Sequence, residues 1–217
     1  MLKGKKLSIL GDSISTYRDV SNDERVNSTI NNNPYFYRDP FPLGKTYWML
    51  LMDRLSLELC VNNSWSGGNL SGTNDVTSGV SRSAELARDN GESPDLIIVF
   101  MGINDLGRNV EASVFAESYE KTLITIRDKY PTAKVCCVNL PDRDVFLKAR
   151  AELFNEKIQS IVESMGEEFF IADLFHSRLN NDFYYMNTLD GLHPDEDGMR
   201  HIADIIEESI IRYFTSI

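Results

Sequence analysis

The 217-residue sequence has few cysteines, few basic residues and no long apolar run, and each of these shortages excludes a class of protein. The three cysteines cannot all pair, and the neighbours Cys136 and Cys137 would point to opposite faces of a strand. A disulfide framework is therefore not expected. The 22 Lys and Arg residues are outnumbered by 33 Asp and Glu residues, which gives a net charge of −11. This acidity argues against nucleic acid as a partner.

No segment is apolar for long enough to cross a membrane. The run of residues 96–101 is far shorter than the ~20 residues that a spanning helix needs. Residues 1–10 begin with lysines, but their apolar part is too short for the core of a signal peptide. We therefore expect no membrane span, and a cytoplasmic protein as sequenced, unless a leader was removed. The sequence indicates no oligomeric state.

The composition is that of an ordinary globular protein. Hydrophobic residues make up 42% of the chain and charged residues 25%, and no linker or repeat divides it. At roughly 100–200 residues per domain, this length suits one domain with a sizeable core. We therefore expect a single domain over residues 1–217.

Apolar segments of strand length alternate with segments of helical periodicity. The expected strands are residues 6–10, 57–61, 96–101, 134–138 and 169–171. The expected helices are residues 47–55, 83–90, 110–129, 145–164 and 198–213. The third and fourth strands are apolar throughout, as in parallel strands that are covered on both faces. This pattern predicts a doubly wound α/β sheet.

Residues 15–46 stand apart as a long loop insertion. The segment is rich in Asn and Asp, contains three prolines and lacks sustained periodicity. Its aromatic residues, which include Tyr35 and Tyr37, are unusual for a disordered segment. Long loops in compact domains are often functional, so this one is a candidate for contact with a substrate.

Polar residues that could carry out chemistry follow the predicted strands. Ser13 follows the first strand within Gly11-Asp12-Ser13, and Asn104 lies just after the third. Asp190 and His193 lie near the carboxyl terminus in a turn that contains Gly191 and Pro194. Ligands of open α/β sheets bind beyond the carboxyl ends of the strands, so these side chains are candidate site residues.

These residue types suit nucleophilic acyl transfer. A serine hydroxyl becomes a nucleophile when a histidine takes its proton, and a carboxylate fixes the tautomer of that histidine. Ser13, His193 and Asp190 could fill these three roles. The backbone amides of Ser13 and Gly67 and the side-chain amide of Asn104 could bind the oxyanion.

The ordered segments resemble the SGNH family of GDSL-type esterases and acylhydrolases. Ser13 matches the family's nucleophile, Gly67 the glycine of its second block, Asn104 the asparagine of its third, and Asp190 with His193 its Asp-x-x-His. The resemblance implies a flavodoxin-like three-layer sandwich with a five-stranded parallel sheet flanked by helices. It also implies serine-dependent ester hydrolysis that needs no metal or other cofactor.

Two features depart from the family pattern or compete with it. Ser64 stands where the second block usually has its middle glycine, so either Gly67 or Gly68 could supply the second oxyanion amide. Asp173 and His176 repeat the Asp-x-x-His spacing after the fifth predicted strand. We favour His193 as the base because Gly191 and Pro194 hold it in a loop ahead of a helix.

The function predicted from these observations is hydrolysis of small carboxylic esters through an acyl-enzyme, most plausibly deacetylation of a carbohydrate. The candidate substrate contacts are Asp12, Trp65, Tyr35 and Tyr37, although the aromatic residues could equally pack against their own domain. The alternatives are an acyltransferase or lysophospholipase with the same triad, and a binding module without turnover. Acidic residues from Asp190 to Asp197 lack the ligand order of a calcium loop, so no metal is expected.

Overall fold

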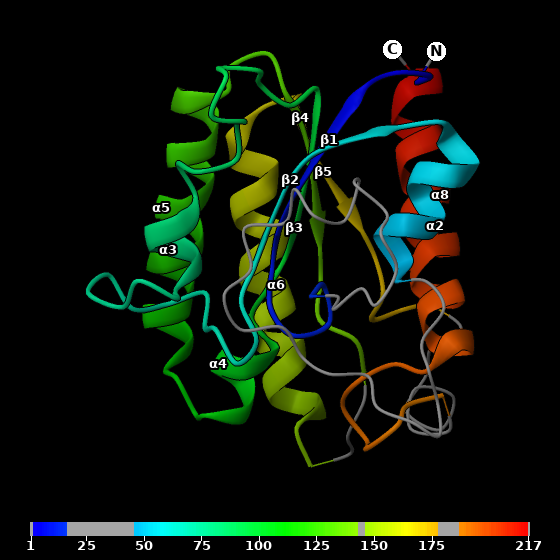
Figure 1. The fold of residues 1–217 in the computed structure, drawn as a ribbon. Coiled ribbons are helices and arrows are strands. Elements are labelled where there is room, and N and C mark those ends of the chain that lie inside the picture. The colour runs from blue at the N-terminus through cyan, green and yellow to red at the C-terminus, as the bar shows by residue number, and fades with distance from the viewer. Residues whose placement is uncertain (1, 17–45, 143–145, 178–186, 217) are drawn as a thin grey trace.

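The computed structural model describes residues 2–16, 46–142, 146–177 and 187–216, and its centre is a five-stranded parallel sheet. Along the sheet the strands follow the order β2-β1-β3-β4-β5 (Figure 1). Their bounds are Lys6–Gly11 for β1, Glu58–Ser64 for β2, Leu96–Phe100 for β3, Lys134–Val138 for β4 and Phe169–Ala172 for β5. All neighbouring strands run parallel, as predicted for an α/β fold.

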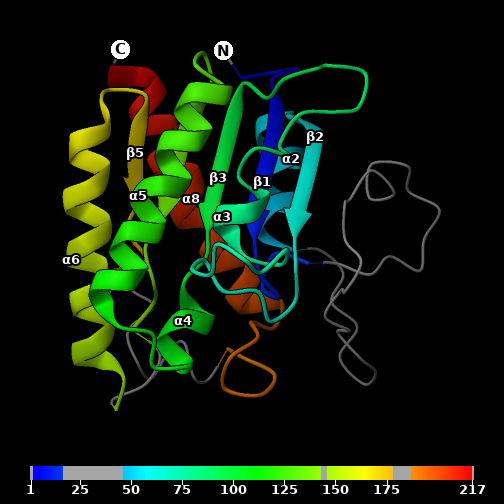
Figure 2. The same cartoon turned by 90° about the vertical axis from the view of Figure 1, so that its left-hand side faces the viewer.

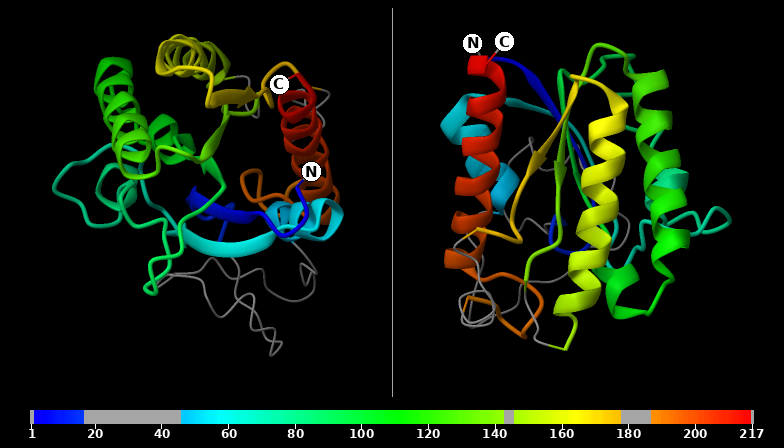
Figure 3. Two further views of the ribbon diagram at one scale, coloured as in Figure 1. Left: turned by 90° about the horizontal axis from the view of Figure 1, so that it is seen from above. Right: turned by 180° about the vertical axis from the view of Figure 1, so that it is seen from behind.

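Helices cover both faces of the sheet. Their bounds are Tyr47–Leu55 for α2, Gly79–Arg82 for α3, Ile103–Gly107 for α4, Ala112–Lys129 for α5, Lys148–Met165 for α6 and Glu196–Ser216 for α8. Helices α3, α5 and α6 lie on one face, and α2 packs against α8 on the other (Figures 2 and 3). The result is a three-layer sandwich.

The packing follows from the apolar pattern of each element. Every residue of β3 is buried, as expected of a central strand with helices on both sides. In α5 the buried Phe115, Tyr119, Leu123 and Ile126 recur every three or four residues and form one helical stripe. These side chains belong to a single core cluster that spans the sheet and both helical layers. Among the described residues, no helix combines the length and apolarity that crossing a bilayer requires.

The second strand is longer than the sequence predicted. Asn62, Asn63 and Ser64 continue β2 and pair with Ile9, Leu10 and Gly11 of β1. Polar residues are tolerated here because their side chains find buried partners. Asn62 Nδ2 donates to the carbonyl of Ser15 at 2.9 Å, and Ser64 Oγ donates to Asn62 Oδ1. The strand therefore carries part of the second sequence block into the interior.

The helix predicted for residues 83–90 was wrong. The structure has only the short α3 before this segment and turns within it. The amides that a helix would use have other partners: Leu86 N donates to the hydroxyl of Tyr130 at 2.7 Å, and Arg88 N donates to the carbonyl of Glu92 at 2.9 Å. A tertiary contact and a local turn thus replace the helical ladder that the apolar spacing indicated.

Helix α4 was not predicted. It begins directly after β3, and its N-cap Gly102 has a φ of 123°. A side chain at Gly102 would also come within 2.9 Å of the Phe115 ring, so glycine fits both the backbone and the space. This sharp entry places Asn104 in the first turn of α4, beside the carboxyl ends of β1 and β3.

Candidate active site

The segment from Gly11 to Thr16 turns sharply at the carboxyl end of β1. Asp12 Oδ1 accepts the amide of Ile14 at 3.0 Å, and the Asp12 carbonyl accepts the amide of Ser15 at 3.1 Å. Gly11 is needed here for space and not for an unusual φ, because a Cβ at this position would lie 2.7 Å from Ser64 Oγ. The turn fixes Ser13 at the end of the strand, where only 3% of the residue is exposed.

Asp190 and His193 form a second tight turn before α8. Asp190 Oδ1 accepts the amide of His193 at 2.8 Å, and Asp190 Oδ2 lies 2.7 Å from His193 Nδ1. Gly191 supplies a φ of 82°, and Pro194 pairs with Thr188 in an isolated antiparallel bridge. Gly191 and Pro194 are the two residues that distinguished this Asp-x-x-His segment from the competing one in the sequence.

The hydrogen bonds in this turn keep Asp190 ionised. Partial burial raises the pKa of Asp190, but the bonds from the amide and ring of His193 outweigh it and lower the pKa to about 2. An ionised carboxylate at this position favours the Nδ1–H tautomer of His193, which leaves Nε2 as an acceptor. The tautomer is inferred from this hydrogen bond.

The two turns meet across the edge of the sheet. His193 Nε2 lies 3.0 Å from Ser13 Oγ, although 180 positions separate the two residues in the chain. The side chain of His193 is only 9% exposed, whereas that of Asp190 is 42% exposed. A hydroxyl, an imidazole and a carboxylate thus lie in hydrogen-bonding series, as the predicted nucleophile, base and orienting acid require.

The loop after β2 contains Gly67 and Gly68, and the sequence allowed either of them to supply the second oxyanion amide. The amide of Gly68 donates to the carbonyl of Trp65 at 3.0 Å, so that donor is used within the loop. Gly67 has a φ of 74°, and the structure gives its amide no partner among the described residues. This arrangement favours Gly67 over Gly68 as an oxyanion donor.

Asn104 connects this loop to the nucleophile turn. Its Nδ2 donates to the carbonyl of Gly68 at 3.0 Å and lies 3.4 Å from Asp12 Oδ2. The second contact is long for a hydrogen bond and is the one a substrate oxygen could replace. The neighbouring Asp105 is fully buried, and its carboxylate accepts the amides of Leu70 at 2.7 Å and Ser71 at 3.0 Å. Asp105 therefore holds the loop.

The candidate substrate contacts differ in their surroundings. Asp12 is 2% exposed, with its carboxyl directed at the Ile14 amide and at Asn104, which favours a role in holding the turn. Burial raises the pKa of Asp12 to about 7, against the lowering effects of the Ile14 amide and the Arg82 charge. Trp65 is partly exposed at the start of the glycine loop. Tyr35 and Tyr37, with most of the loop predicted at 15–46, lie outside the described residues.

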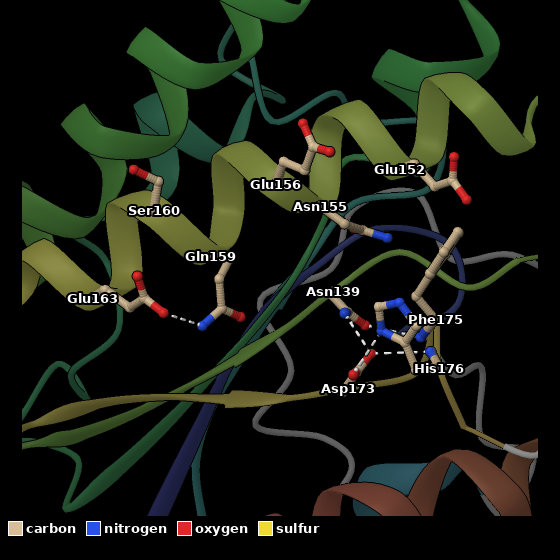
Figure 4. A pocket seen from close by; sticks show the side chains of 10 residues that line it. All are labelled: Asn139, Glu152, Asn155, Glu156, Gln159, Ser160, Glu163, Asp173, Phe175 and His176. Carbon is tan, nitrogen blue, oxygen red and sulfur yellow. Dashed lines mark hydrogen bonds and ion pairs between the residues drawn. The ribbon is translucent and has the colours of Figure 1, made fainter.

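The competing Asp173–His176 pair lies at another part of the same sheet edge. His176 Nδ1 lies 2.9 Å from Asp173 Oδ2, beside a cavity of about 490 Å³ between α6 and the end of β5 (Figure 4). The His176 side chain is 75% exposed, and the structure gives its Nε2 no partner among the described residues. The structure therefore brings His193, and not His176, to Ser13.

Arg82 is a buried residue near the site that the sequence did not single out. It lies within α3 and donates to the carbonyl of Gly11, the residue before Asp12 and Ser13, at 3.0 Å. Nothing in its sequence position signals this contact, because 71 positions separate the two residues. Among the described residues, no three or more His, Cys, Asp or Glu side chains are grouped so that they could hold a metal ion.

A family model for GDSL-like lipases and acylhydrolases matches residues 5–210 of the chain. The chain belongs to the GDSL-like lipase/acylhydrolase family. This confirms the resemblance seen in the sequence, and the match covers every described element from β1 to most of α8. No curated protein matches the chain.

Solved structures with this fold include esterases. A Bacteroides ovatus protein classed as a GDSL-like lipase has 21% identity, covers 97% of this chain and 99% of its own, and superposes with a TM-score of 0.69. A carbohydrate esterase family 3 structure from Talaromyces cellulolyticus has 19% identity, full coverage of both chains and a TM-score of 0.65. An acetyl esterase mutant solved with an acetate ion has 18% identity, covers 100% of this chain and 99% of its own, and has a TM-score of 0.65. At these identities the likeness establishes the fold of this GDSL-family member.

Proposed function

We propose that this GDSL-family protein hydrolyses small carboxylic esters through an acyl-enzyme on Ser13, and that its natural substrates are acetylated carbohydrates. The observation that supports the chemistry is the continuous series from Ser13 Oγ to His193 Nε2 at 3.0 Å and from His193 Nδ1 to Asp190 Oδ2 at 2.7 Å. Membership of a family of ester hydrolases supports the same reaction class.

In the first half-reaction, Ser13 Oγ attacks the ester carbonyl and His193 Nε2 takes the hydroxyl proton. Asp190 holds His193 in the required tautomer and stabilises the imidazolium that forms. The amides of Ser13 and Gly67, with Asn104 Nδ2, donate to the oxyanion of the tetrahedral intermediate. His193 then gives its proton to the leaving alcohol as the carbon–oxygen bond breaks.

The second half-reaction reverses these roles. His193 Nε2 takes a proton from a water molecule, and the resulting hydroxide attacks the acyl group on Ser13. Collapse of the second tetrahedral intermediate frees the carboxylic acid and returns the proton to Ser13 Oγ. No step requires a group other than substrate, water and this chain's own residues.

The carbohydrate acetyl substrate is the finer part of the proposal. It is supported by the names of similar structures, which include a carbohydrate esterase and an acetyl esterase, and by the Asn and aromatic content of the predicted loop at 15–46. A panel of acetylated sugars and p-nitrophenyl esters of increasing chain length tests it. Preference for acetylated sugars is expected, and preference for long acyl chains would indicate a lysophospholipase instead.

The nucleophile is tested with a serine-directed fluorophosphonate followed by mapping of the labelled peptide. We expect the label on Ser13 and loss of both label and turnover in Ser13→Ala. Ser177→Ala is the matched control, because Ser177 adjoins the competing His176 and its hydroxyl donates to the Leu174 carbonyl at 2.6 Å. Turnover that survives Ser13→Ala would refute the acyl-enzyme, and absence of turnover in the unaltered protein would leave the binding-module alternative.

Hydrolase and acyltransferase activities are separated by the product. With an alcohol acceptor present, a hydrolase still releases free acid, whereas an acyltransferase forms a new ester at its expense. We expect free acid to remain the main product.

A further inference from the structure

Arg82 is a buried cation surrounded by neutral acceptors. The residue is 4% exposed, and its five N–H donors all have partners in the protein. Nε donates to the carbonyl of Thr77 at 2.9 Å, and Nη1 donates to the carbonyl and, at 3.3 Å, to Oδ1 of Asn63. Nη2 donates to the carbonyl of Gly11 at 3.0 Å and contacts Met101 Sδ at 3.4 Å.

This guanidinium lacks the usual compensation for burial. Among the described residues no carboxylate forms a salt bridge with Arg82, and the opposing charges act through space, first from Asp12 and then from Glu85 and Asp75. Burial lowers the pKa of Arg82 to about 10, which still leaves it charged at neutral pH. Removing a charge from water costs free energy, so the offsetting stabilisation must come from the hydrogen bonds to the carbonyls that the cation holds.

The acceptors of Arg82 come from the segments that build the proposed site. The Gly11 carbonyl belongs to the peptide that leads into Asp12 and Ser13, and Asn63 lies at the carboxyl end of β2 just before the glycine loop. Thr77 lies where the chain returns from that loop to α3. Gly68 faces the same cation, since a Cβ there would lie 3.4 Å from Arg82 Nη2. One planar group thus spans the nucleophile turn and both ends of the oxyanion loop.

We propose that Arg82 is a positioning residue for the ester hydrolysis proposed above: its guanidinium sets the distance between the Ser13 turn and the Gly67 loop. The inference rests on that proposed function. Arg82 acts through the backbone it holds, and its positive charge also favours the ionised form of the nearby Asp12 carboxyl. The rigid fork matters as much as the charge, because a lysine cannot bridge the same three segments.

Arg88 provides a matched comparison at the other end of β2. It also donates to strand carbonyls, those of Leu59 and, at 3.4 Å, Cys60, and its Nη1 lies 2.6 Å from Glu92 Oε2. Leu59 and Cys60 are near the amino end of β2, opposite the edge that carries Ser13. Arg88 therefore also holds strand carbonyls, but it does so at the end of β2 opposite the proposed site.

The experiment compares Arg82→Lys and Arg82→Met with Arg88→Lys and Arg88→Met. Steady-state kinetics on an acetyl ester, the rate of fluorophosphonate labelling and urea unfolding are measured for each protein. In both Arg82 variants we expect kcat and the labelling rate to fall ~10²-fold, as for a displaced reacting group, while KM changes little. The Arg88 variants should unfold at lower urea concentration yet keep their kcat.

Each other outcome contradicts the proposal. Folded Arg82 variants with unchanged kcat would show that the contact only stabilises the chain, and failure of both to fold while the Arg88 pair folds would assign Arg82 to folding alone. A ~10²-fold loss of kcat in the Arg88 variants as well would show that the effect does not depend on the place of Arg82 beside the Ser13 turn. The proposed function fails separately, when Ser13→Ala retains the turnover of the unaltered protein.

Discussion

Two Asp-x-x-His turns lie along the same edge of the sheet, one beside the end of β1 and one after the end of β5. Their internal bonds are alike. In the first turn the His193 amide and Nδ1 lie 2.8 and 2.7 Å from the Asp190 carboxylate, and in the second the His176 amide and Nδ1 lie 3.1 and 2.9 Å from the Asp173 carboxylate. Their surroundings differ, since the His193 side chain is 9% exposed and that of His176 is 75% exposed.

The comparison separates what a local turn can do from what the fold must add. Any Asp-x-x-His turn of this shape can orient an imidazole, because all of its bonds lie within four residues. A nucleophile within reach of Nε2 requires a distant segment, and among the described residues only the first turn has one, the Ser13 turn at 3.0 Å. The family's Asp-x-x-His motif is therefore informative only together with the serine block that precedes it.

The largest expected effect comes from exchanging each histidine for alanine. His193→Ala should lower kcat ~10⁴–10⁶-fold, because the serine then has no base and the groups act as a unit. His176→Ala should leave kcat unchanged, since its ring reaches no nucleophile among the described residues. Kinetics on an acetyl ester check both, and equal losses in the two variants would show that the second turn takes part in the reaction.

Exchanging the two aspartates for asparagine should give a smaller difference in kcat than exchanging the two histidines. Asp190→Asn should lower kcat ~10⁴-fold by favouring the wrong tautomer of His193, as in serine proteases. Asp173→Asn should keep full turnover. Because the pKa of Asp190 is lowered to about 2, titration of Asp190 should not shape the kcat profile near neutral pH. Loss of activity in Asp173→Asn at neutral pH would contradict the assignment of the catalytic pair.

The sequence named the candidate site residues that the structure brings together, but it missed parts of the segments that support them. Ser13, Asn104, Asp190 and His193 could be named because they follow apolar strands at points where parallel sheets bind ligands. The extension of β2 through Asn62 to Ser64 was missed because polar residues are uncommon in a buried strand, and their partners come from distant segments.

The buried charges could not be predicted at all. In the sequence, Asp12 follows the first predicted strand and Arg82 precedes the helix predicted at residues 83–90, and their burial depends on how three strand ends converge. The helix predicted at residues 83–90 failed for the same reason, since Tyr130, more than forty positions away, takes the amide of Leu86. Periodicity reports local preference, whereas these contacts depend on tertiary structure.

Titration of Asp12 and of Asp173 should change the stability of the protein in opposite directions, and Asp12 should give the larger effect. Its pKa is raised to about 7 in the folded protein from 3.8, so between these values the folded state holds a proton that the unfolded state has released. Its contribution is fully present below pH ~4 and is lost as the pH rises through 7. Between pH 5 and 8 this loss should amount to about 2–3 kcal/mol of unfolding free energy.

Urea unfolding of the unaltered protein and of Asp12→Asn at pH 5 and pH 8 checks this expectation. The asparagine cannot titrate, so the variant should lose less stability over this interval, and other groups cancel in the comparison. The pH slope is compared rather than absolute stability, because the new amide changes the contact with Asn104. Parallel slopes would mean that Asp12 is already ionised at pH 5 in the folded protein.

Asp173 should show the opposite sign and the smallest effect. Partial burial raises its pKa, but the bonds from the Asn139 side chain and from the amide and ring of His176 lower it overall. A lowered pKa stabilises the folded state above the unfolded value of 3.8 and loses that contribution as the pH falls through the folded value. Because the side chain is 46% exposed, the contribution should resemble that of a surface pair, about 1 kcal/mol or less.

The unfolding free energies of Asp173→Asn and of the unaltered protein should therefore converge as the pH falls from 7 to 3. A difference that widens at low pH would show that burial dominates the titration of Asp173, as it does for Asp12.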